Sequence, residues 1–218
     1  MPATTSTLPN RFALHLDITE ARTWMLLIAI HLIALGTLFA GHGLYIRAKA
    51  EFAQILLEDA WTKTLATGQP TKAWSWADTW PIARISIPRL NEHAIVLKEA
   101  GGEALAFGPA HVAASPMPGE NGTTVIAAHR DTHFTFLKDL KPGDEIDITT
   151  SAGKTIRYRM TGSTIVHAQA SGIMTKGKTQ RLALVTCYPF DGLQRGPLRY
   201  VVFAEVAPPT SRVAVSTD

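Results

Sequence analysis

EIDITTSAGKTIRYRM, residues 145–160, is the stretch of sequence that decides the fold. It holds two runs in which apolar and polar side chains alternate, separated by the turn-forming pair Ala152-Gly153. Alternation with a period of two places every apolar side chain on one face of a β-strand. The apolar positions are Ile146 and Ile148 in the first run, and Ile156, Tyr158 and Met160 in the second. The stretch therefore predicts two half-buried strands joined by a turn.

The same period of two recurs through residues 81–207, for example where Ile85 and Ile87 alternate with polar neighbours. Turn signals separate the runs at 118–119, 121–122, 142–144, 152–153 and 191–192. Two short segments, 103–107 and 134–140, are expected to be single helical turns. Strands at this spacing, with no long helix between them, favour a small β-barrel or sandwich of seven or eight strands.

The segment before this domain contains an apolar run, WMLLIAIHLIALGTLFAGHGLY, at residues 24–45. It has 22 residues and no Lys, Arg, Asp or Glu. As a helix it would be roughly 33 Å long, which is enough to cross the hydrocarbon core of a bilayer. The run therefore predicts a single transmembrane helix that acts as an uncleaved signal anchor. Basic residues are almost balanced on its two sides, so charge alone does not set its orientation.

A second helical pattern follows the apolar run, over residues 47–66, and Gly68 and Pro70 end it. It predicts a stalk, or a helix packed on the next domain. The last residues are polar and rich in Pro, Ser and Thr, so we expect a flexible tail. The predicted organisation is an N-terminal segment, a transmembrane anchor, a helical stalk and linker, a β domain and a tail, at 1–23, 24–46, 47–80, 81–207 and 208–218.

Composition and charge exclude several classes of function. The chain has 218 residues, and its formal net charge of +3 comes from 21 Lys and Arg against 18 Asp and Glu. The basic residues are scattered, which argues against a dedicated nucleic-acid binder. The single cysteine, Cys187, excludes an internal disulfide framework, an iron–sulfur cluster and a Cys-rich zinc site.

Cys187 is nevertheless the sharpest chemical feature of the sequence. It ends the apolar run RLALVTC, and Pro189 limits how far that strand can continue. His129 ends a second such run, TTVIAAH, and the basic pair Arg195 and Arg199 follows the cysteine. If these strand ends meet on one rim of a barrel, they offer a thiol nucleophile, an imidazole to move its proton, and a guanidinium to stabilise an oxyanion.

Two other interpretations of these residues are open at this point. A lone cysteine is often an inert core residue. The spacing His129-x-Asp131-x-His133 also places potential metal ligands on one side of an extended chain, although no second ligand group accompanies them. We expect Asp131 and His133 to support the site rather than to bind a metal.

Three blocks of the sequence resemble the sortase family of membrane-anchored cysteine transpeptidases. They are GPAHVAASPMPGENGTTVIAAHRDTHFTFLKDLKPGDEI, LALVTCYPF and LRYVVFAE, which occur in the family's order within residues 80–207. The sequence looks most like the Gram-negative branch, called class GN.

The resemblance implies roles for individual residues. Cys187 would be the nucleophile, His129 the general acid and base, and Arg199 the residue that positions substrate and stabilises the oxyanion. Arg199 matches better than Arg195 because the family's arginine directly precedes an apolar strand. Thr186 matches a threonine that helps to stabilise the acyl intermediate. The chain departs from the family pattern at Ala183, where a threonine is usual, and this puts in question any role for a hydroxyl there.

The resemblance also implies a fold, a reaction and a location. The fold would be a closed eight-stranded β-barrel with short helices. The reaction would cleave an LPxTG-like C-terminal sorting signal of a secreted or membrane-tethered protein and transfer the acyl group to an amine or water, with no cofactor and no metal. The chain would be a single-pass protein of the inner membrane, with residues 1–23 cytoplasmic and the catalytic domain periplasmic.

Two other functions fit parts of the sequence. An L,D-transpeptidase also pairs a cysteine and a histidine in an exported β domain. Those enzymes usually hold both residues in one glycine-rich motif, whereas 58 residues separate His129 from Cys187. A membrane-tethered barrel that binds a partner peptide without catalysis would leave Cys187 unreactive toward thiol reagents.

Overall fold

The computed structural model of the chain describes residues 18–192 and 196–208. The chain separates into two compact units, with the division between Lys49 and Ala50.

Helix α1, Ile18–Thr67, is continuous over the predicted anchor and the predicted stalk. The window around its apolar run is long and apolar enough to cross a membrane, and none of that window is buried. The helix ends where Gly68 adopts φ +70 and donates its N–H to the carbonyl of Thr64. Glycine suits this position because left-handed backbone costs it little. The predicted helix at 47–66 and its stop at Gly68 are therefore confirmed.

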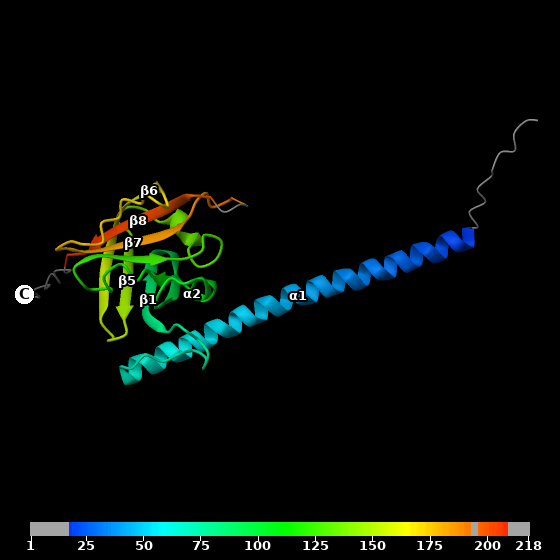
Figure 1. The fold of residues 1–218 in the computed structure, drawn as a ribbon, viewed down its shortest axis with the longest axis horizontal. Coiled ribbons are helices and arrows are strands. Elements are labelled where there is room, and N and C mark those ends of the chain that lie inside the picture. Colours follow the sequence, from blue (N-terminus) through cyan, green and yellow to red (C-terminus); the bar gives the residue numbers. More distant parts are fainter. Residues whose placement is uncertain (1–17, 193–195, 209–218) are drawn as a thin grey trace, which may run out of the picture. The chain divides into compact units, whose positions relative to one another are not determined.

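The β domain is a closed barrel of eight strands, which confirms the predicted fold class (Figure 1). The order around the barrel is β1-β2-β3-β4-β7-β8-β6-β5. The strands are β1 Pro81–Ile87, β2 Glu92–Leu97, β3 Ala110–His111, β4 Gly122–Ala127, β5 Glu145–Thr150, β6 Thr155–His167, β7 Gln180–Cys187 and β8 Leu198–Val206. Short helices lie between them: η1 Pro88–Leu90, α2 Gly102–Phe107 and η2 Thr135–Asp139. The two predicted helical turns correspond to α2 and η2.

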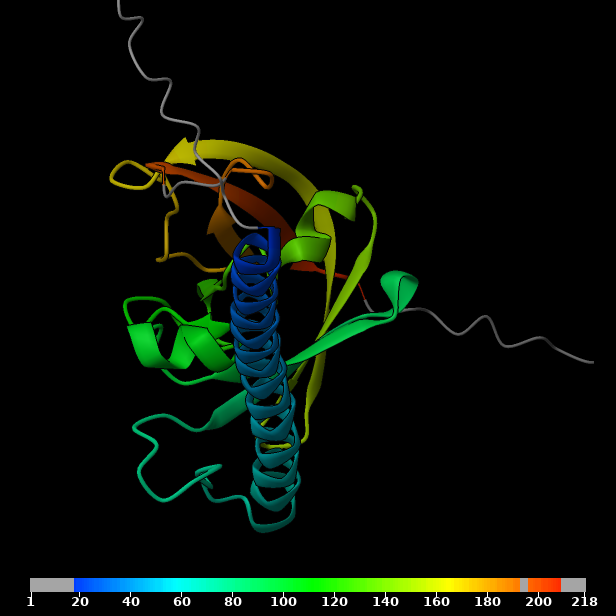
Figure 2. The same ribbon diagram turned by 90° about the vertical axis from the view of Figure 1, so that its right-hand side faces the viewer.

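Most neighbouring strands in the barrel are antiparallel. β5 and β6 form the hairpin that the alternating stretch predicts, with Ile146 opposite Tyr158 and Ile148 opposite Ile156. β6 then continues along β8, with a register shift between Met160 and Gly162 (Figure 2, where β6 is yellow and β8 orange-red). The exceptions to the antiparallel pattern are β2 with β3 and β4 with β7, which run parallel.

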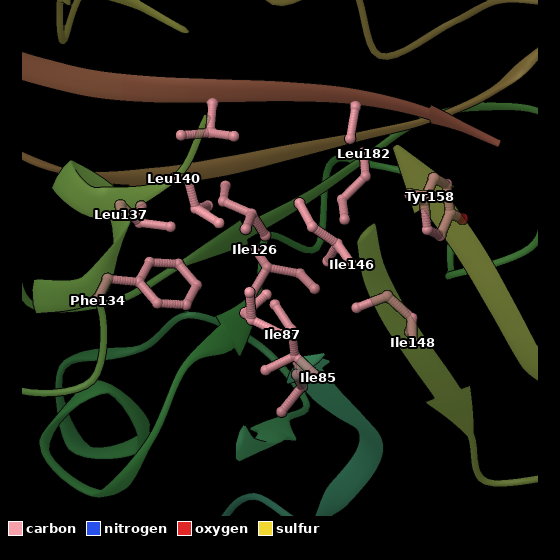
Figure 3. Packing of buried hydrophobic residues seen from close by; sticks show 14 of the residues in the cluster. Ile85, Ile87, Ile126, Phe134, Leu137, Leu140, Ile146, Ile148, Tyr158 and Leu182 are labelled. Atoms are coloured by element: carbon pink, nitrogen blue, oxygen red, sulfur yellow. The ribbon is translucent and has the colours of Figure 1, made fainter. Parts of the chain in front are cut away.

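The barrel interior is filled by apolar side chains from every long strand (Figure 3). The five alternating residues of the β5–β6 hairpin are all buried in this core, at 0 to 7% exposure. Phe134 and Leu137, from the segment around η2, are fully buried and complete it. Burial of each such side chain contributes about 1.5–3 kcal/mol, so the alternation specifies which face of each strand turns inward.

Two smaller apolar clusters lie outside the main core. One joins Leu57 and Trp61 of α1 to β2, β3 and α2. The other covers β4, β7 and β8 and contains Val125, Ala183 and Val201. The second cluster is on the same side of β7 as Cys187, because Ala183 and Cys187 are four residues apart on one strand.

Candidate active site

Strand register brings His129, Cys187 and Arg199 to one level of the barrel. β4 and β7 pair in parallel with a constant offset of 58 residues, from Gly122 opposite Gln180 to Ala127 opposite Val185. Extending this offset of 58 residues two positions beyond Ala127 pairs position 129 with position 187, so His129 lies level with Cys187. β7 and β8 pair in antiparallel register, and their last pair is Cys187 with Arg199. Three neighbouring chain segments therefore present the three predicted catalytic residues at one end.

These three residues line a common cavity of about 530 Å³. The other residues that line it are Gly102, Leu105, Arg130, Asp131 and Gly196. A cavity that holds a thiol, an imidazole and a guanidinium contains the groups needed for nucleophilic attack, proton transfer and anion stabilisation.

Cys187 is the last residue of β7 and has a free, half-buried thiol. Leu182, Leu184 and Thr186 point into the barrel, so the alternation of the strand turns Cys187 to the outer surface. The backbone of a paired strand holds the sulfur in place while the cavity gives it access to a substrate.

Thr186 ties the cysteine strand to the histidine segment. Its hydroxyl is buried and donates a hydrogen bond of 2.8 Å to the carbonyl of Ala128, the residue before His129. The N–H of Ala128 donates in turn to the carbonyl of Val185 at 3.1 Å. Thr186 is not among the residues that line the cavity. Its hydrogen bond instead fixes the level of His129 relative to Cys187.

Ala183, the departure from the family pattern, is fully buried in the outer cluster with Val125 and Val201. It lies opposite Val125 on β4 and opposite Phe203 on β8. A methyl group suits these apolar neighbours.

Arg199 is held at the start of β8 by two hydrogen bonds to its own chain. Its Nη1 donates to the carbonyl of Gly196 at 2.9 Å and to the carbonyl of Leu198 at 2.8 Å. Within the described part of the chain, its Nε and Nη2 groups make no hydrogen bond. A guanidinium fixed through one nitrogen can direct the remaining N–H groups at a carbonyl or an oxyanion.

Arg130 is a part of the site that sequence reasoning missed. Its Nη1 donates to the carbonyl of Pro189 at 2.7 Å, and its Nη2 donates to the carbonyl of Gly192. It therefore joins the histidine segment to the loop that follows Cys187. A basic residue beside His129 was visible in the sequence, but its acceptors are backbone carbonyls, which no sequence motif marks.

The other predicted site residues fall in three different places. Asp131 is exposed and lines the cavity, whereas His133 is half-buried and does not line it. Burial lowers the pKa of His133, and the neighbouring charge of His129 lowers that pKa further. Arg195 lies outside the described residues. Among the described residues, no grouping of three or more His, Cys, Asp or Glu side chains could hold a metal ion.

The wall of the cavity formed by α2 was also not predicted. The sequence indicated a helical turn at 103–107, but nothing in it placed Gly102 and Leu105 beside the cysteine. That neighbourhood depends on how the β2–β3 connection folds over the barrel, which residue spacing does not reveal.

Comparison with known proteins gives one consistent result. A family model described as the sortase domain matches residues 85–207. Sortase D of Bacillus subtilis is 30% identical over 122 residues, which cover 56% of this chain and 61% of that protein. The chain thus spans about three fifths of this relative's length.

Solved structures of sortases share the fold. Sortase A from Corynebacterium diphtheriae is 26% identical with a TM-score of 0.56, and the match covers 63% of this chain and 65% of that one. The Sortase D5 transpeptidase of Clostridium perfringens is 22% identical with a TM-score of 0.59, and the match covers 72% of this chain and 99% of that one.

Proposed function

Because the chain belongs to the sortase family, through a match over residues 85–207, we propose that it is a cysteine transpeptidase. Its substrate is a protein with an LPxTG-like C-terminal sorting signal, and its acceptor is an amine or water. The observation that carries the proposal is the register that sets His129, Cys187 and Arg199 at one level around one cavity.

In the first step, the thiolate of Cys187 attacks the backbone carbonyl carbon of the sorting signal. A carbon–sulfur bond forms, and the carbonyl electrons move to oxygen. When the tetrahedral intermediate collapses, the peptide C–N bond breaks and His129 gives a proton to the departing amine. The products are a thioester on Cys187 and a free C-terminal fragment.

In the second step, the acceptor amine attacks the thioester carbonyl. His129 takes a proton from the amine, a new amide bond forms, and the thiolate leaves. Water in place of the amine gives hydrolysis. The two steps together exchange one amide for another and need no redox partner, metal or cofactor.

Arg199 would stabilise the oxyanion of both tetrahedral intermediates. Arginine cannot accept a proton at any ordinary pH, so its contribution is electrostatic. Its Nε and Nη2 groups, which make no hydrogen bond to the described residues, suit this role. Thr186 would act by aligning the two catalytic strands through Ala128.

We further infer that the chain is anchored by the apolar part of α1 as a single-pass inner-membrane protein. The support is the length and composition of that segment together with the family. The catalytic domain would then be periplasmic, and the Gram-negative class GN remains the branch that the sequence motifs favour. We also propose the domain boundaries predicted from the sequence, with the anchor at 24–46, the stalk and linker at 47–80 and the catalytic domain at 81–207.

The test uses the full-length chain in detergent micelles. Fluorogenic peptides that vary around LPxTG are incubated with glycine and lysine amines, with and without a chelator, and intact-mass spectrometry monitors Cys187. We expect an acyl-enzyme whose added mass equals the N-terminal part of one peptide, and a ligated product unaffected by the chelator. A cysteine that stays unacylated with every peptide and also resists small thiol reagents would favour a non-catalytic binding module.

A further inference from the structure

Helix α2 forms one wall of the candidate cavity through Gly102 and Leu105. The helix has six residues, is preceded by Gly101 and is followed by Gly108. A helix of this length is not stable in isolation, because nucleation costs more than so few hydrogen bonds return. The position of the wall must therefore be set by what packs against α2.

The second half of α1 supplies that packing. Leu57 and Trp61 are 2% and 3% exposed and share an apolar cluster with Ala104 of α2. Gln54, one turn before Leu57, donates its side-chain N–H to the carbonyl of Phe107 at 2.7 Å. Phe107 ends α2, where carbonyls have no partner within the helix. This hydrogen bond therefore caps the C-terminal end of α2.

Two further contacts restrict α2 from other directions. The ring of Trp74, in the segment after α1, packs edge-on against Phe107 with centroids 4.7 Å apart. At the exit from α2, a Cβ on Gly108 would lie 2.9 Å from the carbonyl oxygen of Ile95 on β2. The chain therefore lies directly against the barrel there and cannot shift toward it.

We propose that Gln54, Leu57 and Trp61 of α1 are positioning residues of the active site, which hold α2 so that Leu105 forms a fixed apolar wall in the cavity of Cys187. This inference rests on the proposed function for its substrate, a sorting peptide. These three residues lie on the face of α1 that packs against α2, so this face of the helix, and not its exposed face, influences the cavity. They act on substrate binding through Leu105, not on the reacting atoms.

The kinetic test replaces the capping donor with an apolar side chain of similar length, Gln54→Met, in the full-length protein. We expect KM for the sorting peptide to rise about fivefold with kcat little changed, since one ordinary hydrogen bond is lost. In a Leu105→Ala background, Gln54→Met should raise KM little further, because the side chain through which Gln54 affects substrate binding is then absent. Fully additive effects in the double variant would overturn the proposal.

The control is Thr62→Ala on the same helix. Thr62 is exposed, and its hydroxyl donates to the backbone carbonyl of Glu58 one turn earlier on the same helix. This variant should match the wild type in KM and kcat. If it raised KM as much as Gln54→Met does, the effect would come from general helix stability, and the positioning role would be wrong.

A second measurement does not depend on sortase activity. Cys187 is the only thiol, so its alkylation by small iodoacetamide and bulky N-phenylmaleimide can be compared directly. A loosened α2 wall in Gln54→Met should raise the rate ratio of the bulky to the small reagent several-fold, and Thr62→Ala should leave it unchanged. An unchanged ratio in Gln54→Met overturns the positioning role, whereas a changed ratio without acyl transfer would retain it and reject only the proposed reaction.

Discussion

The two ends of the barrel carry cavities of nearly the same size. The cavity with Cys187 measures about 530 Å³, and a cavity around Lys154 and Gln180 measures about 490 Å³. Both are bounded by β7, which runs from Gln180 at one end to Cys187 at the other. At about 3.3 Å per residue, the two ends of that strand are roughly 23 Å apart.

The difference between the ends is chemical. The described residues that line the second cavity include Lys154, Arg157 and Gln180, but no thiol and no imidazole. Arg157 is also committed to an ion pair with Asp147 at 2.8 Å. The presence of a cavity therefore does not by itself identify the site. What distinguishes the first cavity is that two strand registers, β4 with β7 and β7 with β8, place complementary reactive groups on it together.

The largest expected effect comes from replacing Cys187, whose thiol lines the cavity at one end of the barrel and has no counterpart among the described residues of the cavity at the other end. Cys187→Ala should abolish acyl transfer, because no other described residue at either cavity offers a thiol. Folding should survive, since the half-buried sulfur makes no hydrogen bond to any of the described residues of the barrel. The measurements are product formation and the midpoint of thermal unfolding. A correctly folded variant that still forms ligated product would disprove the assignment of the nucleophile.

The next effect tests the guanidinium at the same end. Arg199→Ala should lower kcat by about 10²–10³-fold, the range seen when one oxyanion donor is removed from an active site. Arg199→Lys should restore only part of the lost kcat, because a single ammonium cannot both bond to the carbonyl of Gly196 and reach the substrate. Steady-state kinetics of both variants is the check. A larger loss from Arg195→Ala than from Arg199→Ala would reverse the choice between the two arginines.

Arg130 should give a smaller loss. In Arg130→Lys, one ammonium replaces the planar group that reaches the carbonyls of Pro189 and Gly192, so the loop after Cys187 is held less firmly. We expect kcat/KM to fall about five- to tenfold, through one to two weakened hydrogen bonds. Arg181→Lys is the matched control, since its 3.0 Å ion pair with Glu205 is exposed and joins β7 to β8 at the end of β7 away from Cys187. Equal losses in the two variants would mean that Arg130 has no special position.

The sequence was sufficient to predict the frame of the fold and to nominate candidate reactive residues. The alternation in residues 145–160 specified which side chains turn inward, because a buried face of a strand repeats every two residues. Cys187 and His129 could be found because each ends an apolar run. The choice of Arg199 and the prediction of a closed barrel came from the family resemblance and not from periodicity.

The contacts that escaped prediction share a physical cause. Arg130, Thr186 and Gln54 all donate to backbone carbonyls far away in the chain. Every residue carries such a carbonyl, so no residue type marks the acceptor. The position of α2 escaped for the same reason, since a six-residue helix takes its place from distant contacts rather than from its own sequence.

A modest pH effect is expected from His133, which is half-buried and does not line the cavity. Burial and His129 lower the pKa of His133 in the folded protein below the ordinary value near 6.5. Below about that pH the unfolded chain binds the proton more readily, so the stability associated with His133 is lost as the pH falls. His133→Gln should therefore lose less unfolding free energy than the wild type between about pH 7.5 and pH 5.5. Denaturant titrations at both pH values measure this difference, and parallel losses would contradict it.

The smallest expected effect tests the second cavity itself. Lys154→Glu reverses a charge at the end of the barrel far from Cys187, where the side chain is exposed. Physiological salt screens charges over about 8 Å, well short of the roughly 23 Å that β7 spans between the two ends. We therefore expect kcat/KM for the sorting peptide to stay within about twofold of the wild type at 0.15 M salt. A tenfold loss with unchanged unfolding would mean that this cavity also contacts the substrate, and the chemical contrast between the two ends would no longer separate a working site from an idle one.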